Sequence, residues 1–201
     1  MSFDLAFRFT LGEEGGKVDN KNDRGKRTAY GITQATYNAW TYPLIKDVWD
    51  ISARDVYEIK KKWYWGPVWG TRMDEIDPRL GVLLYDAAIH SGPGRSVKWL
   101  QAALNRGLAI DGQVGPRTLM AVHGAWDVGE GDAVLSEALA ARRLFLYHLA
   151  ARDSTQKEFL SGWLSRCGRI EEVITNPSCD CASACEQVQK PLPKGFTWPL
   201  P

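Results

Sequence analysis

The stretch LGEEGGKVDNKNDRGKRTAYGIT, residues 11–33, marks a change from a helical pattern to a glycine-punctuated one. Upstream of it, four residues spaced four, four and three apart fall on one face of a helix: Phe3, Phe7, Leu11 and Glu14. The spacing predicts a helix over residues 3–14 that ends at the Gly-Gly pair. Residues 17–32 have no helical period, and we expect a short, irregular β-hairpin there.

Working outward, helix signals recur along the chain. Five residues are expected to cap, start or stop helices: Thr33, Ser52, Pro78, Gly92 and Pro116. Two longer helices are predicted over residues 131–151 and 155–174. The sequence therefore predicts a mainly α fold with a small β-hairpin near the N-terminus.

The amino-acid composition narrows the classes of protein to which this chain can belong. The chain has 201 residues, 44% of them hydrophobic, and a net charge of +1, which gives no electrostatic reason to expect nucleic acid as a partner. No run of about 18 apolar residues is present, so no membrane span is expected. The first 16 residues lack a basic segment and a cleavage site, so we expect synthesis and retention in the cytosol.

The four cysteines, Cys167, Cys179, Cys181 and Cys185, lie near the C-terminal end of the chain. Their spacing does not match a zinc finger, so free thiols or disulfides within the tail are expected instead of a zinc site. No HExxH-type histidine pair is present, and no metal or organic cofactor is expected. Residues 176–201 form a Cys- and Pro-rich tail.

Glu14 has unusual surroundings for a carboxylate. It shares a face with apolar residues, and it lies at the C-terminal end of a helix, where the dipole disfavours a negative charge. Desolvation acts in the same direction, so both effects favour a protonated carboxylic acid near neutral pH. Such a group suits general acid catalysis on a glycosidic oxygen. The alternative is an ordinary helix end followed by a polar loop with surface carboxylates.

Asp23 lies nine residues farther along, among basic and polar residues that should keep it ionised. A neutral acid and an ionised carboxylate that face one cleft are the groups needed to hydrolyse a glycoside. Thr28 is placed to hydrogen-bond a water molecule held by Asp23.

The combined pattern EGG followed by DRGKRTAYGIT resembles the signature of glycoside hydrolase family 108, the N-acetylmuramidases of phages and bacteria. The family's usual form is close to E-G-G-Y and D-P-G-G-x-T-x-x-G-I-T, and this sequence departs from it at Lys17, Arg24 and Lys26. The resemblance implies a lysozyme-like helical fold with Glu14 as the catalytic acid. The Glu-x8-Asp-x4-Thr spacing is also similar to that of phage-type lysozymes, which implies that Asp23 and Thr28 assist, and Tyr30 is assigned to substrate binding.

The second half resembles the predicted peptidoglycan-binding domain that accompanies this family. The family's D-x-x-x-N-x-G motif is matched by Asp86, His90 and Gly92, with His in place of Asn. Asp86 and His90 are one helical turn apart and are predicted to line the substrate cleft, although a capped helix end with a satisfied histidine is an alternative. The predicted organisation is a catalytic half over residues 1–92, a second helical half over residues 93–175 packed on the first, and the tail.

The resemblance implies an endolysin-type muramidase that hydrolyses the β-1,4 bond between N-acetylmuramic acid and N-acetylglucosamine in peptidoglycan. A monomer is expected, made in the host cytoplasm and dependent on a holin to reach the cell wall in the periplasm. Two alternatives are a lytic transglycosylase and a non-catalytic wall-binding or secretion-accessory protein.

Overall fold

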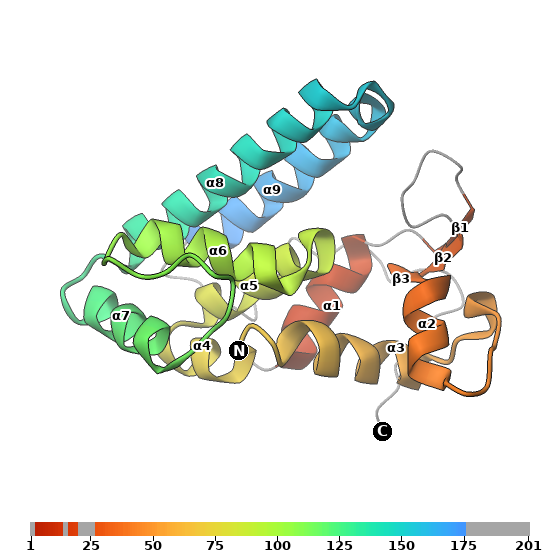
Figure 1. The fold of residues 1–201 in the computed structure, drawn as a ribbon. Coiled ribbons are helices and arrows are strands. Elements are labelled where there is room, and N and C mark those ends of the chain that lie inside the picture. Colours follow the sequence, from red (N-terminus) through yellow and green to blue (C-terminus); the bar gives the residue numbers. More distant parts are fainter. Residues whose placement is uncertain (1–2, 14–15, 20–26, 176–201) are drawn as a thin grey trace.

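The computed structural model describes residues 3–13, 16–19 and 27–175, and Figure 1 shows their arrangement. The N-terminal elements are α1 (Phe3–Glu13), β1 (Lys17–Asp19), β2 (Arg27–Ala29), β3 (Ile32–Thr33), α2 (Gln34–Thr41), the 3-10 helix η1 (Val48–Asp50) and α3 (Ala53–Lys60). The central elements are the π-helical turn η2 (Lys61–Trp65), α4 (Gly70–Ile76), α5 (Pro78–Ser91) and α6 (Pro93–Leu104). The last are α7 (Pro116–Asp127), α8 (Gly131–Arg152), the 3-10 helix η3 (Ser154–Phe159) and α9 (Leu160–Thr175). The predicted mainly α fold with a small antiparallel sheet near the N-terminus is confirmed.

The first helix follows its apolar spacing. Phe7 and Leu11 are fully buried in α1, and Phe3 is nearly so. Phe3 packs edge-on against Tyr57 and Tyr85, at ring centroid distances of 5.0 and 5.5 Å. The face on which the sequence places Glu14 is thus the face that enters the core.

The predicted hairpin is a three-stranded antiparallel sheet in the order β1-β2-β3. Thr28 is in the middle strand, opposite Val18 on one side and Thr33 on the other. Thr33 then caps α2, because its side chain accepts a hydrogen bond from the Thr36 N–H at 3.1 Å. One residue therefore ends the sheet and begins the next helix.

Other predicted caps are present. Ser52 accepts a hydrogen bond from the Asp55 N–H at the start of α3, at 3.0 Å. Pro78 occupies the first turn of α5 as predicted, and Asp77, which was not singled out in the sequence, caps that helix. Gly92, with φ of 87°, ends α5 and directly precedes α6.

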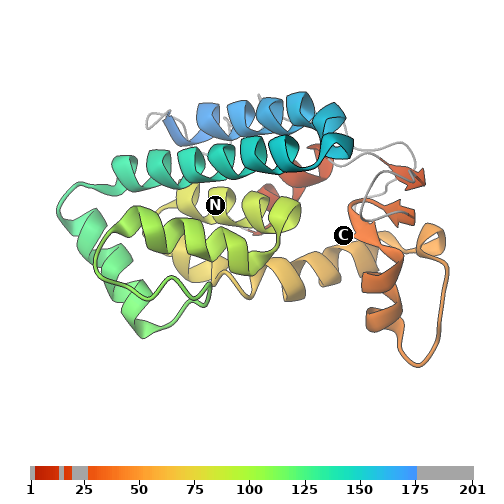
Figure 2. The same ribbon diagram turned by 45° about the horizontal axis from the view of Figure 1, so that its top comes forward.

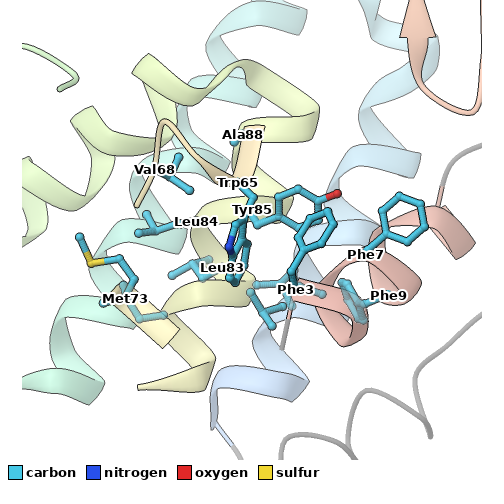
Figure 3. Packing of buried hydrophobic residues seen from close by; sticks show 14 of the residues in the cluster. Phe3, Phe7, Phe9, Trp65, Val68, Met73, Leu83, Leu84, Tyr85 and Ala88 are labelled. Carbon is cyan, nitrogen blue, oxygen red and sulfur yellow. The ribbon is translucent and has the colours of Figure 1, made fainter. Parts of the chain in front are cut away.

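Helix α5 is the centre of the molecule. Every residue from Leu80 to Ala88 is buried, and Figure 3 shows Leu83, Leu84 and Tyr85 packed among side chains from α1, η2 and α4. The buried hydrophobic residues form one cluster that extends from α1 to α9. This core crosses the predicted division near residue 92, as expected for two halves packed on each other, and the division itself stays a prediction.

Helices α8 and α9 form a long antiparallel pair beside α5 and α6, as the two views in Figures 1 and 2 show. Among the helices described, none has both the length and the apolar character needed to cross a membrane.

Candidate active site

The predicted acid Glu14 and its predicted partner Asp23 lie outside the described residues, so the site is defined by what surrounds them. Helix α1 ends at Glu13 and strand β1 begins at Lys17. In Figures 1 and 2 the C-terminal end of α1, the sheet, the α5–α6 junction and the α8–α9 junction all lie toward the same side of the molecule. The segments next to the predicted site residues therefore lie on one side of the molecule.

The turn between β2 and β3 is hydrogen-bonded to Gly16. The Tyr30 N–H donates a hydrogen bond to the Gly16 carbonyl at 3.2 Å. Tyr30 has a φ of 51°, in the left-handed region that a bulky residue rarely adopts, and only 8% of the residue is exposed. The strained tyrosine turn thus connects the sheet to the segment that follows α1.

Thr28 is half-buried in β2. Its neighbour Arg27 donates two hydrogen bonds to the Asp47 carboxylate, at 3.1 and 2.6 Å. The Arg27 guanidinium also stacks on Trp49, 3.6 Å from the ring centroid. Hydrogen bonds from Arg27 and from the Trp49 backbone hold the pKa of Asp47 below its usual value. These contacts fix the middle strand against the segment that leads into η1.

Asp86 is placed as a buried structural anion. Its side chain is fully buried, and its two oxygens accept hydrogen bonds from Arg142 at 2.6 Å and Arg166 at 2.8 Å. Burial alone would raise the pKa of this carboxyl, but attraction to Arg166 and Arg142 holds it below the usual range. In this arrangement the carboxylate links α5 to α8 and α9 and has no surface for a sugar, so the predicted substrate contact of Asp86 has no support here.

His90 lines a pocket of about 380 Å³. The other lining residues come from α5, α6, α8, η3 and α9: Ser91, Arg95, Phe145, Leu146, Leu149, Gln156 and Trp163. The His90 ring packs edge-on against Trp163, with centroids 5.7 Å apart. This pocket offers aromatic and polar groups together, as ligand pockets usually do.

Arg142 holds His90 as well as Asp86, because its second terminal nitrogen lies 3.3 Å from His90 Nδ1. A guanidinium can only donate, so Nδ1 accepts and the neutral ring carries its hydrogen on Nε2. The structure therefore brings the predicted residues Asp86 and His90 together through an arginine.

Sequence reasoning missed Arg142, Arg166 and Trp163, because their partners are dozens of residues away in the chain. A signal was nevertheless present for Arg142. It continues an apolar helical stripe with Leu135, Leu139 and Leu146, all of which are buried. A charged residue at such a position requires a buried counter-charge.

Comparison with known proteins finds two family models that match successive parts of the chain. The family model for glycosyl hydrolase 108 matches residues 7–92, and the model for the predicted peptidoglycan domain matches residues 95–168. The solved structure of SagA from Brucella abortus is similar to this chain, with a TM-score of 0.71 and 32% sequence identity. That similarity covers 89% of this chain and 96% of the SagA chain. A search of curated proteins gave no match.

The identity to SagA over most of both chains and the two adjoining family models lead to one assignment. The protein belongs to the glycosyl hydrolase 108 family and is a glycoside hydrolase that acts on peptidoglycan.

Proposed function

We propose that this protein is a muramidase that cleaves the β-1,4 bond between N-acetylmuramic acid and N-acetylglucosamine, with Glu14 as the acid. One observation carries the proposal. Glu14 directly follows the last residue of α1, a helix whose Phe7 and Leu11 are fully buried. It also precedes Gly16, whose carbonyl is bonded to the turn of the sheet.

The end of α1 suits a carboxylic acid that keeps its proton. The last turn of the described helix contains no basic residue that would stabilise an anion. The negative end of the helix dipole lies there, and the apolar face beside it adds a desolvation cost to the ionised form. Glu14 is therefore expected to remain protonated at a pH where an ordinary glutamate is ionised.

The reaction begins when Glu14 gives its proton to the bridging oxygen as the bond from that oxygen to C1 of N-acetylmuramic acid breaks. The oxygen of water then bonds to C1. In an inverting course Asp23 accepts the proton of that water, with Thr28 as a hydrogen-bonding partner. In a retaining course Asp23 stabilises the positive charge at C1 or bonds to it, and Glu14 later takes the proton of water. The anomer released first, observed by NMR, distinguishes the two courses.

The pocket at His90 is the proposed place for a sugar next to the cleaved bond. Trp163 supplies an aromatic surface, and donors come from His90 and from Arg95, whose guanidinium lies over the Phe145 ring, 4.3 Å from its centroid. An N-acetylated sugar presents an apolar ring face and several acceptor oxygens. Such a ring is complementary to this combination of groups.

Glu14→Gln tests the assignment, with Glu13→Gln as its matched control. The expected result is loss of reducing-end release from purified Gram-negative sacculi for Glu14→Gln, with normal thermal unfolding and retained binding. Glu13, one helical step away, should be replaceable. Unchanged release by Glu14→Gln would remove Glu14 from the mechanism. Mass spectrometry of the wild-type products should show reducing N-acetylmuramic acid, and 1,6-anhydro ends would instead indicate a lytic transglycosylase.

The proposal extends to an endolysin that is held in a host cytoplasm and acts on the periplasmic wall after a holin opens the membrane. The combination of a hydrolase region and a peptidoglycan domain in one chain supports a role in wall breakdown. Coexpression with a holin should clear a culture, whereas expression alone should not. Lysis without a holin would contradict the dependence.

A further inference from the structure

A second pocket lies at the other side of the molecule from the candidate active site, between α4 and α7. Its volume is about 620 Å³. The residues that line it come from both family-matched regions: Trp69, Arg72, Glu75, Ile76, Leu119, His123, Trp126 and Asp127. Figures 1 and 2 both show α4 and α7 at the side away from the sheet. This α4–α7 pocket has no part in the catalysis proposed above.

The indole of Trp126 is fixed in place. Its N–H donates to the buried carboxylate of Asp77 at 3.0 Å. Asp77 is itself held by Arg79, so the acceptor does not move freely. On the other side Gly131 lets the ring approach the chain, because a Cβ there would lie 2.9 Å from the indole. Trp126 is thus a rigid, half-buried wall of the pocket.

Trp69 reaches the same pocket from a strained backbone. Its φ of 51° and ψ of 40° are in the left-handed region, which costs a bulky residue about 1–3 kcal/mol. The following residue, Gly70, lies so close to the Trp65 ring that a Cβ there would be 2.2 Å away. This close packing sets the turn that presents Trp69 to the pocket. Strain of this kind is concentrated at functional positions.

The rim of the pocket is polar. Arg72 and Glu75 form an exposed ion pair at 3.0 Å, and His123 and Asp127 are exposed on α7. The fixed indole of Trp126 and the half-buried one of Trp69, with polar groups around them, suit a ring that has one apolar face and hydroxyl or acetamido groups at its edge. Charge alone does not select a strongly anionic or cationic ligand, because both signs are present.

We propose that the α4–α7 pocket is a second, non-catalytic binding site for the glycan strand of peptidoglycan, in which an N-acetylated sugar ring stacks on Trp69 and Trp126. The proposal rests on peptidoglycan being the substrate of the protein. A site at the side away from the active site holds the enzyme on an insoluble polymer between cleavage events. In such a site α7, which lies in the region matched by the peptidoglycan domain, contacts the glycan directly.

Binding is measured by sedimentation with purified sacculi, using the full chain in the Glu14→Gln background so that no cleavage occurs. Trp69→Gly removes one indole that packs against the core, while glycine adopts the left-handed backbone without strain, and thermal unfolding checks that the variant folds. Binding should weaken by about thirtyfold, as expected for a central tryptophan. Arg72→Ala, at a side chain that is 67% exposed, should weaken binding by about threefold without affecting folding.

Met120→Ala is the matched control, because Met120 is 73% exposed on α7 and does not line the pocket. Competition then identifies the ligand. Glycan strands stripped of peptide should displace the protein from sacculi, and the free stem peptide should not. Binding unchanged in both pocket variants, or displacement by the peptide alone, would overturn the proposal. Because cleavage by the wild type is measured separately, a failure of the muramidase assignment would be seen as a failure of reducing-end release.

Discussion

At the scale of single residues, the buried Asp86 carboxylate forms ion pairs with Arg142 and Arg166. Two guanidinium groups and one carboxylate are held inside the core, with hydrogen bonds of 2.6 and 2.8 Å. Desolvation of such a group is expensive, so the net value of the cluster is small while it is complete. Removal of one member leaves buried charge without compensation.

We therefore expect Asp86→Asn to lower the free energy of unfolding by about 3–5 kcal/mol. Urea denaturation at neutral pH measures the loss. Asp50→Asn, at an exposed aspartate, should change stability by less than about 0.5 kcal/mol. A loss for Asp86→Asn no larger than that of the control would show that the arginines find other partners.

The same residue predicts a dependence on pH. The pKa of Asp86 in the folded protein is below its usual value of 3.8, because attraction to Arg166 and Arg142 outweighs the effect of burial. A depressed folded pKa contributes stability that is complete above the unfolded pKa, and this contribution falls as the pH drops through the folded pKa. The stability gap between wild type and Asp86→Asn should therefore be constant from pH 7 to 5 and should narrow below about pH 4. A constant gap down to pH 3 would contradict the ionised state of Asp86.

His90 predicts a separation of kinetic effects. If its Nε2–H donates to a sugar in the pocket, then His90→Leu removes one hydrogen bond to the sugar, worth about 1 kcal/mol or roughly fivefold in KM, along with the contact to Arg142. The value of kcat should change little, since His90 does not reach the reacting atoms in the mechanism proposed. His148→Leu, at an exposed histidine of α8, is the control. A fall in kcat with constant KM would place His90 in the chemical step instead.

At the scale of elements, two glycines predict opposite results for the same substitution. Gly70→Ala at the start of α4 brings a Cβ to 2.2 Å from Trp65 and should destabilise by about 1–3 kcal/mol. Gly168→Ala within α9 meets no atom within 4 Å and should stabilise by about 0.5–1 kcal/mol. Thermal melts of the two variants measure the contrast. Equal shifts would mean that Trp65 moves aside without cost.

The elements themselves were largely predictable, because their signals are local. The apolar spacing lies within α1 itself, and Thr33, Ser52 and Pro78 lie at the starts of the helices that they were predicted to begin. Helix α4 was not foreseen, since its first turn is set by contact between Gly70 and Trp65 and not by a capping side chain. The predicted start of the last helix at residue 155 was early, because η3 precedes α9.

Only part of the site was predictable, because sequence patterns reveal local spacing and not contacts between distant residues. The sequence predicts a helix that ends near Glu14, and it shows the one-turn spacing of Asp86 and His90. The pairing of Asp86 with Arg142 and Arg166 joins residues 56 and 80 positions apart, and no local pattern encodes such contacts. The functions assigned to Glu14, Asp23 and Thr28 stay predictions that the variants above test.

At the scale of the whole molecule, contacts cross the boundary between the two family-matched regions. The Ser96 hydroxyl of α6 donates to the Leu84 carbonyl of α5 at 2.7 Å. Asp86 of α5 pairs with arginines of α8 and α9. Since the apolar core is continuous across the same boundary, neither region has a separate core within the described residues.

One cooperative unfolding transition follows from this continuity. Leu100→Ala in α6, at a fully buried position, should lower stability by about 2–5 kcal/mol. The loss should be shared by α1, on the other side of the boundary, because its buried Phe7 belongs to the same cluster. Hydrogen exchange measures this directly: the slowest amides of α1 and α6 should accelerate by the same factor in the variant. Calorimetry should give equal calorimetric and van't Hoff enthalpies for the wild type. Acceleration confined to α6, or two separate heat absorption peaks, would show that the halves unfold independently and that the division near residue 92 is a true domain boundary.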